Sequence, residues 1–288
     1  MSKTFTVTEF FKRFPDDDSC LDHLMVVRHG KSLDCPKCGK HGKFSKIKKL
    51  PAYQCAWCGH HIHPKVGTPF AKSSTALQKW CYAMYLFTTS RHGVPAKELQ
   101  RQLGVTYKTA WRMGHEIRKY MGIVDGDNGL SGHVEVDEAY IGGKDNVMGR
   151  PTINSGSKKV AVFGMVERGG DIITRVIPDV KTKTLIPHII INIEDGSIVS
   201  SDEMRTYKNL PDYGFKHGFV RHNLKQWRKG IHHTNTIEGF WSQIKRSIQG
   251  THIHVSRKHM SKYLGEFEYR YNMRSNPSLM FVRLLASF

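Results

Sequence analysis

The sequence predicts a multidomain α/β protein in which a small metal-binding module, a helical region and a larger α/β domain follow one another. Two cysteine pairs lie near the N-terminus, an apolar pattern of helical period fills residues 75–121, and an alternating pattern rich in β-branched residues starts at residue 133. A polar, glycine-rich stretch at residues 122–132 marks the clearest boundary. The predicted domains comprise residues 1–70, 71–122 and 130–288.

The chain is strongly basic. Its 288 residues include 44 Lys and Arg against 25 Asp and Glu, a formal net charge of +19. Because such an excess of like charge opposes compaction, it indicates a polyanionic partner, with nucleic acid as the leading candidate. A ribosome-like or halotolerant surface charge without a specific partner is the alternative.

No apolar run approaches the length of a membrane span, and the N-terminus lacks the apolar segment of a signal peptide. We therefore expect no membrane partner and a cytoplasmic location. In that compartment the six cysteines argue against disulfides. Cys20 and Cys81 have no partner at metal-ligand spacing and are expected in the core.

The other four cysteines have the spacing of a structural zinc site. Cys35 and Cys38 form one CxxC pair, and Cys55 and Cys58 form a second after 16 intervening residues, each pair followed directly by glycine. Two such pairs complete a tetrahedral four-sulfur site, and the segment between them suits the hairpin of a zinc ribbon. One alternative is that zinc has a purely structural role and holds this module together. The six lysines within residues 37–49 also make contact between the module and DNA plausible. Residues 1–30 are expected to form two short helices before it.

The helical region carries the pattern of a helix-turn-helix motif. One helix is predicted from Pro95 to Leu103 and a second from Thr106 to Tyr120, with Gly104 in the turn. A simple helical hairpin is the alternative, and the basic residues of the segment favour DNA binding. Three side chains of the second helix would face the major groove: Tyr107, Lys108 and Arg112.

The third domain predicts a mixed sheet with flanking helices. Its expected elements are three antiparallel strands at 133–143, 158–170 and 171–178, a helix at 181–193, a fourth strand at 196–203, a short fifth at 219–223, and two late helices at 232–246 and 256–274. Three strands, a helix, a further strand and then helices is the order of an RNase H-like core.

Acidic residues lie within the first and at the end of the fourth of these predicted strands. Val134 and Val136 point to one face of the first strand, so Glu135 and Asp137 point to the other. A carboxylate inside a strand is unfavourable unless it is paired or binds a metal. Asp202 ends the fourth strand.

One late helix adds a third acid. Asn235, Glu238, Trp241, Ser242 and Lys245 recur at helical spacing and would share one face. Two strand carboxylates and one helix carboxylate can bind two Mg²⁺ (or Mn²⁺) ions, which stabilise the attacking and leaving oxygens of phosphoryl transfer. Oxygen ligands select such hard cations.

Each of these residues also has a structural interpretation. Asp137 can be a strand-edge acid, Asp202 an N-cap, and Glu238 with Lys245 a solvated helix face. We expect Trp241 in the core rather than as a stacking platform. Lys245 and Arg246 are expected to hold phosphates rather than to transfer protons. Three neighbouring acids are expected at the surface or in support of the metal ligands: Glu135, Glu138 and Glu203.

Several segments, in order from residue 30 to residue 275, together resemble DDE-type insertion-sequence transposases of the zinc-ribbon group (ISXO2-like), which are related to the Merlin transposases. The segments that carry the resemblance are CPKC…CAWC, TPFAKSSTALQKW, LGVTYKTAWRM, VEVDEAYIGGK, VFGMVERGG, SDEMRTY and HTNTIEGFWSQIKRSIQGTHIHVSRKHMSKYLGEFEYRYN.

The resemblance implies an RNase H-like fold and metal-dependent cutting of terminal inverted repeats, followed by joining of the 3′ ends to target DNA. It implies a bacterial, nucleoid-associated protein that works as a homodimer on double-stranded DNA. Asp137, Asp202 and Glu238 match the catalytic acids. The third position is Asn in some members and Glu in others, so Asn235 is the alternative ligand, and we prefer Glu238 because a charged oxygen binds Mg²⁺ better.

Two other functions fit parts of the pattern. One is a non-catalytic DNA-binding regulator derived from a transposase. The other is an RNase H-like nuclease or resolvase that cuts DNA without joining it.

Overall fold

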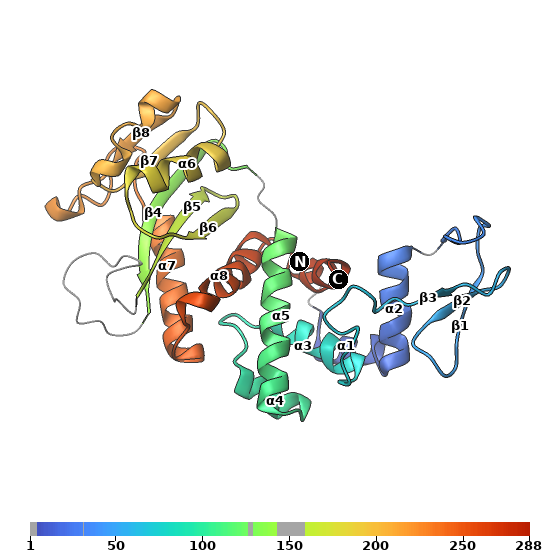
Figure 1. The fold of residues 1–288 in the computed structure, drawn as a ribbon. Coiled ribbons are helices and arrows are strands. Elements are labelled where there is room, and N and C mark those ends of the chain that lie inside the picture. Colours follow the sequence, from blue (N-terminus) through green and yellow to red (C-terminus); the bar gives the residue numbers. More distant parts are fainter. Residues whose placement is uncertain (1–4, 31, 126–128, 143–158) are drawn as a thin grey trace. The chain divides into compact units, whose positions relative to one another are not determined.

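The computed structural model describes residues 5–30, 32–125, 129–142 and 159–288, which form two compact units (Figure 1). The first unit comprises Met1–Tyr120 and Asn276–Phe288, and the second comprises Met121–Ser275. Parts of three predicted elements, namely residues 126–128 of the linker and residues 143 and 158 at the ends of two strands, lie outside the described residues.

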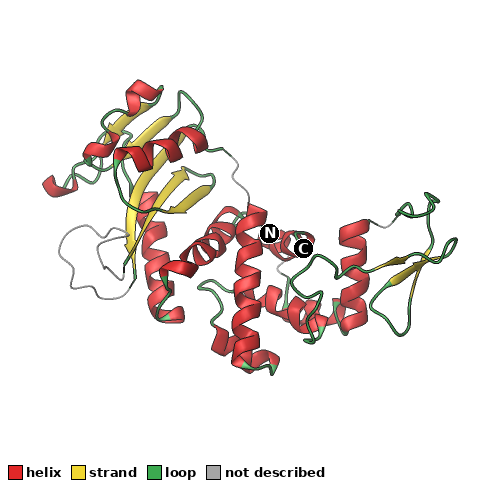
Figure 2. Cartoon of the chain, in the orientation of Figure 1, coloured by secondary structure: helices red, strands yellow, loops and turns green. Residues whose placement is uncertain are grey.

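The first unit consists of helices and one small sheet (Figure 2). Its helices are α1 (Val7–Arg13), α2 (Asp17–His29), α3 (Leu77–Thr89), α4 (Ala96–Leu103), α5 (Tyr107–Asp125, which continues into the second unit) and α9 (Pro277–Ala286). The two predicted N-terminal helices are confirmed, because Thr6 and Asp16 accept hydrogen bonds from the backbone N–H groups of Glu9 and Ser19 and so cap α1 and α2.

Helix α9 packs in the first unit, although the sequence alone grouped it with the third predicted domain. The ring of Phe281 lies 5.5 Å from that of Phe14 and 6.1 Å from that of Phe10 (centroid distances). All three rings are buried. Aromatic contacts between the two ends of the chain therefore hold α9 in place.

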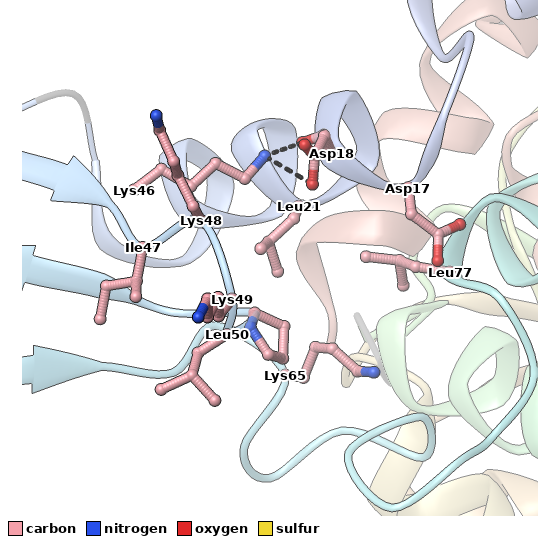
Figure 3. A pocket seen from close by; sticks show the side chains of 11 residues that line it. Asp17, Asp18, Leu21, Lys46, Ile47, Lys48, Lys49, Leu50, Lys65 and Leu77 are labelled. Atoms are coloured by element: carbon pink, nitrogen blue, oxygen red, sulfur yellow. Dashed lines mark hydrogen bonds and ion pairs between the residues drawn. The ribbon is translucent and has the colours of Figure 1, made fainter.

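Strands β1 (Phe44–Lys46), β2 (Tyr53–Cys55) and β3 (His61–Ile62) form the antiparallel sheet of the cysteine-containing module. The module is fastened to α2 by Lys46, whose Nζ lies 3.1 Å from a carboxylate oxygen of Asp18 (Figure 3) and 3.2 Å from Asp22 Oδ1. The Tyr53 hydroxyl also donates a hydrogen bond to Asp22. Lys46 is thus a packing residue of the module.

The second unit is built on a five-stranded mixed sheet in the order β6-β5-β4-β7-β8. Its strands are β4 (His133–Ile141), β5 (Val160–Glu167), β6 (Ile172–Val176), β7 (Ile198–Ser201) and β8 (Lys216–Phe219). Strands β4, β5 and β6 form the predicted antiparallel meander, and β7 and β8 run parallel to β4. The fifth strand lies earlier than predicted, because the chain turns after Phe219 into the 3₁₀ helix His222–Leu224.

Helices cover both faces of this sheet (Figure 1). Helix α6 (Thr182–Asn192) packs on the face that carries Val134 and Val136, whereas α7 (Asn235–Ser247) and α8 (Arg257–Asn272) pack on the opposite face. The remaining short helical turns span Arg205–Tyr207, Leu210–Tyr213 and Ile248–His252. Successive side chains of β4 point to opposite faces of the sheet and therefore contribute to two different hydrophobic cores.

Among the helices that the structure describes, none combines the length and apolar character that a membrane span needs.

Helix α7 approaches the sheet closely because β5 has a glycine beneath it. Gly164 pairs with Asp137 of β4. A Cβ atom built on Gly164 would lie 2.5 Å from Cζ2 of Trp241 and 2.9 Å from Cδ1 of Ile237. Trp241 is buried in this core, as predicted. The bare backbone of Gly164 therefore makes room for the indole that holds α7 against the sheet.

We expect Gly164→Ala to lower the free energy of unfolding by about 1–3 kcal/mol, since the added methyl group overpacks the contact with Trp241. Urea denaturation followed by circular dichroism measures the change. Gly239→Ala on α7 is the matched control: no atom lies within 4 Å of the added Cβ, so this variant should be unchanged or up to about 1 kcal/mol more stable. Equal effects of the two substitutions would contradict the packing argument.

Candidate functional site

Four cysteine side chains of the first unit converge on one point. Cys35, Cys38, Cys55 and Cys58 hold their Sγ atoms within 4.8 Å of one another. The Sγ atoms of Cys35 and Cys58 are 3.6 Å apart, and those of Cys38 and Cys55 are 4.0 Å apart. Four thiolates about 2.3 Å from one tetrahedral zinc ion lie roughly 3.8 Å from each other. The predicted ligand set therefore fits a structural zinc ion.

The two cysteine loops have the same backbone design. The N–H of Gly39 donates to the carbonyl of Cys35 (2.8 Å), and that of Gly59 donates to the carbonyl of Cys55 (3.0 Å). Both glycines have positive φ angles, 67° and 71°. A residue in the left-handed conformation closes each tight loop, so that both cysteine thiols of the loop point inward. Glycine adopts this conformation readily, which explains the glycine after each CxxC pair.

In the second unit, two of the predicted acids stand on neighbouring strands. Strands β4 and β7 are parallel and pair Glu135 with Ser200. Asp137 and Asp202 each follow two residues later, Asp137 within β4 and Asp202 directly after β7. Glu238 lies in the first turn of α7. The fold therefore gathers acids that the sequence distributes between positions 137 and 238.

The electrostatics of Asp137 reflect this gathering. Burial and, after it, the carboxylates of Asp202 and Glu238 together raise the pKa of Asp137 to about 7, while Lys245 opposes the rise. Like charges close together disfavour ionisation of each carboxyl group. A cation bound between these carboxylates would offset their mutual repulsion.

Asp137 and Glu238 border an open cavity of about 390 Å³, whereas Asp202 does not belong to its lining. Two strand acids, Asp137 and Glu138, line it together with residues of α7 and of the helical turn that follows: Glu238, Trp241, Ser242, Lys245, Arg246 and Gln249. The polar face of the helix at spacings of three and four residues thus borders one cavity. Asn235 is the first residue of α7, is exposed, and does not belong to this lining.

The three carboxylates are near one another without forming a closed cluster. In the described part of the chain, the four cysteines are the only group of three or more candidate ligands whose atoms lie within 4.8 Å of one another. Glu238 has other partners in this structure. Its Oε1 accepts a hydrogen bond from the Thr234 hydroxyl (2.7 Å) and lies 3.3 Å from Nε2 of His222.

Glu135 has a role that the sequence did not predict, since we expected it at the surface or beside the metal ligands. Its side chain is fully buried. The carboxylate accepts hydrogen bonds from the backbone N–H groups of Thr236 (2.8 Å) and Ile237 (3.1 Å), which belong to the first turn of α7. It also accepts from the Thr236 hydroxyl (2.9 Å) and from Arg168 Nε (2.7 Å).

This arrangement fixes the start of α7 to strand β4. A carboxylate at a helix N-terminus satisfies free N–H groups and interacts favourably with the helix dipole. Because Glu238 follows in the same turn, the position of its backbone depends on Glu135. The period-two alternation of β4 placed Glu135 on the same face as Asp137. The contact with α7 is what makes Glu135 a buried acid, whereas Asp137 borders the cavity.

The other acids of the region have local tasks. Asp202 Oδ1 accepts a hydrogen bond from the backbone N–H of Met204 (2.9 Å) in the turn after β7. The N-cap of the 3₁₀ helix that follows is Met204, without a side-chain cap hydrogen bond, so the N-cap role considered for Asp202 is wrong. Glu138 accepts a hydrogen bond from the Tyr207 hydroxyl. Glu203 accepts from the backbone N–H of His222 (2.7 Å) and so supports the turn after β8.

The two helices and the glycine turn predicted in the first unit are present. Gly104 follows α4 in the left-handed conformation (φ 58°, ψ 44°). The hydroxyl of Thr106 accepts a hydrogen bond from the N–H of Thr109 (3.2 Å) and caps α5 as predicted.

All three candidate DNA-contacting residues of α5, Tyr107, Lys108 and Arg112, are exposed. The amine of Lys97 lies 5.0 Å from the centroid of the Tyr107 ring. Arg112 interacts within its own unit, because its guanidinium donates to the Ser73 hydroxyl (3.2 Å) and lies 5.6 Å from the centroid of the Trp80 ring.

The comparison with known proteins agrees with this architecture. Residues 129–272, half of the chain, match the family model of the ISXO2-like transposase domain, and residues 15–61 match that of the transposase zinc-ribbon domain. The chain belongs to the ISXO2-like transposase family. The resemblance inferred from the motifs is thereby confirmed.

Two relatives are similar to this transposase-family chain over different lengths. An uncharacterized protein in transposable element ISH50 of Halobacterium salinarum is 26% identical over 285 residues, which cover 92% of this chain and 94% of that protein. An uncharacterized transposase-like protein of Haemophilus influenzae is 32% identical over 101 residues, 35% of this chain and 80% of that protein. The solved Mos1 transposase paired-end complex with left transposon end has 13% identity and a TM-score of 0.31 over 72% of this chain and 78% of that chain. So weak a structural likeness carries no argument.

We expect Cys35→Ser to abolish zinc binding and to unfold the module of residues 33–68, while Met121–Ser275 stays folded, because the metal contributes the folding energy of so small a sheet. Zinc content and limited proteolysis of the full chain measure both effects. Lys37→Ala, an exposed change inside the same loop, is the control and should bind zinc normally. Loss of structure throughout the chain, or undiminished zinc, would contradict the assignment.

We expect Glu135→Ala to lower the free energy of unfolding by about 3–5 kcal/mol, because it leaves the Arg168 charge and two N–H groups of α7 without their acceptor. Glu194→Ala removes an exposed carboxylate of the same unit and should change stability by less than about 0.5 kcal/mol. Urea denaturation compares the two variants. A similar small change in both would mean that Glu135 does not anchor α7.

Proposed function

We propose that the chain is a DDE transposase that binds the terminal inverted repeats of its own insertion sequence, cleaves the DNA and joins the 3′ ends to target DNA. The observation that carries the proposal is the open, partly basic cavity that Asp137 and Glu238 border, together with the electrostatic interaction of Asp202 and Glu238 with Asp137. The strand order of the sheet and the membership in a transposase family support an RNase H-like catalytic core.

The donor set suits Mg²⁺ or Mn²⁺. Carboxylate oxygens are the ligands that such hard cations prefer, and burial together with the neighbouring carboxylates of Asp202 and Glu238 raises the pKa of Asp137. Asp137, Asp202 and Glu238 would hold the ions, and Glu238 would exchange the Thr234 hydroxyl for metal. Two such ions stabilise the attacking and leaving oxygens of phosphoryl transfer when bound. We propose Glu238 rather than Asn235 as the third ligand, because Glu238 borders the cavity.

Basic residues at two places would position the DNA. Lys245 and Arg246 border the cavity beside the acids, where they can hold the phosphates that flank the cleaved bond. Helices α4 and α5 would bind the duplex of the inverted repeat, with exposed Tyr107, Lys108 and Arg112 toward the major groove. We further propose a homodimer that pairs two DNA ends in the bacterial cytoplasm, at the nucleoid.

A non-catalytic DNA-binding regulator is the second candidate. The observation that favours it is the separation of the three carboxylates, which do not form a compact ligand cluster in the described residues. Catalysis would then be absent while DNA binding through the first unit persisted.

We expect Asp137→Asn to reduce strand transfer of a pre-cut repeat end, assayed with Mg²⁺ or Mn²⁺, by at least about 100-fold, because a metal-binding carboxylate is lost. Glu238→Gln should have a comparable effect, whereas Asn235→Ala should stay within a few-fold of the unchanged chain. DNA affinity should be retained in all three, since none of them removes a positive charge.

Asp212→Asn, at an exposed acid of the same unit, is the control and should retain full strand transfer. Joined product that survives Asp137→Asn would contradict the catalytic assignment. Cleavage without joining by the unchanged chain would identify a nuclease or resolvase. DNA binding with neither reaction would favour the regulator.

A further inference from the structure

The segment between β8 and α7 exposes large apolar side chains beside the proposed active site. In residues 221–231, Leu224 is 66% exposed, Trp227 57% and Ile231 52%. Single exposed apolar residues are common on protein surfaces, but three within eight residues form a patch, and such patches often mark binding surfaces.

The same segment is strongly basic. It contains four cations and no carboxylate, the cations being Arg221, Lys225, Arg228 and Lys229. The guanidinium of Arg221 lies 5.5 Å, and the amine of Lys229 5.8 Å, from the centroid of the Phe219 ring. A segment that combines an exposed indole with four cations suits a ligand that has both flat aromatic rings and negative charge.

The segment has a defined structure. The carboxylate of Glu203 accepts hydrogen bonds from the backbone N–H groups of His222 (2.7 Å) and Asn223 (3.3 Å). Lys229 and His232 exchange two backbone hydrogen bonds, 2.9 and 3.0 Å long. Arg168, which also binds Glu135, donates to the carbonyl of Ile231 (2.7 Å). Hydrogen bonds therefore fix the backbone that carries the exposed side chains.

A chain of two contacts connects Trp227 to Glu238. The indole and the imidazole of His222 have centroids 5.0 Å apart. Nε2 of the same imidazole lies 3.3 Å from Oε1 of Glu238. The exposed indole is therefore one side chain away from the carboxylate proposed to bind metal.

We propose that residues 221–231 hold an unpaired nucleotide of the DNA end, with its base stacked on Trp227 and its phosphates on the neighbouring cations. The proposal rests on the proposed transposase function and assigns the nucleic-acid element that this surface takes.

The chemistry of the surface favours an unpaired nucleotide over a duplex or a protein. In a continuous duplex, both faces of each base are covered by neighbouring bases, so an indole can stack only on an unpaired or terminal base. Stacking on an aromatic side chain tolerates any base, because every base has a π-face. The four cations would oppose a basic partner, including a second copy of this surface.

The test uses the full chain and duplexes of its terminal repeat, either blunt or with a two-nucleotide 3′ tail that carries 2-aminopurine. Binding is measured in Ca²⁺, by anisotropy and by quenching of the 2-aminopurine. We expect the unchanged chain to quench the tail base and to bind the tailed end more tightly than the blunt end. Trp227→Ala should weaken binding of the tailed end by about tenfold and leave the blunt end within twofold.

Two further variants separate stacking from packing. Trp227→Phe keeps a ring against His222 and should retain most of the quenching. Tyr213→Ala removes an exposed aromatic residue of the same unit outside the segment, and it should bind both ends like the unchanged chain.

Equal weakening of both ends by Trp227→Ala, or no change in either, would overturn the proposal, and the second result is the one expected of a protein-binding surface. Strand transfer, assayed in parallel, distinguishes failure of the stacking proposal from failure of the proposed transposase function. If the unchanged chain joins ends but Trp227→Ala binds the tail normally, the stacking proposal fails and the transposase function stands. If tail binding depends on Trp227 but nothing is joined, the stacking proposal stands and the transposase function fails.

Discussion

The carboxylate of Glu135, buried between strand β4 and the start of helix α7, is the interaction on which the geometry of the proposed active site depends. It belongs to the strand that carries Asp137, and it accepts two backbone hydrogen bonds from the helix that carries Glu238. Arg168 compensates its charge. A buried carboxylate without such partners would be strongly unfavourable, so strand and helix are held in one relative position.

A second fixed point lies further along the same helix. Trp241 rests on the bare backbone of Gly164, which pairs with Asp137. Two attachment points on one stiff helix determine its height and rotation above the sheet. Glu238 and Lys245 therefore border the same cavity as Asp137. The electrostatic consequence is a small acidic site in a chain of net charge +19, which suits a metal ion at the centre and a polyanion around it.

Local rules of sequence predicted a large part of this structure. The spacing of the cysteines indicated the four-sulfur site, and the alternation along residues 133–141 indicated the first strand and the face of Asp137. The helical spacing of Glu238, Trp241 and Lys245 indicated one face of a helix. These features depend on residues close together in the chain, where chain geometry limits the possible arrangements.

Contacts distant in sequence could not be predicted in this way. Glu135 and Thr236 are 101 residues apart, so no periodicity connects them, and the alternation rule placed Glu135 and Asp137 on the same face. Helix α9 packs beside Phe10 and Phe14 at the other end of the chain. Trp227 lies in a segment without strand or helix periodicity, and only the contact of His222 with Glu238 relates it to the site.

Anomalous X-ray scattering from crystals of the full chain grown with its DNA end and Mn²⁺ would locate the metal of the proposed active site. We expect manganese bound by oxygens of Asp137, Asp202 and Glu238, with Glu135 still hydrogen-bonded to the start of α7. Manganese held by Asn235 instead of Glu238, or no manganese at these carboxylates while DNA is bound, would contradict this assignment.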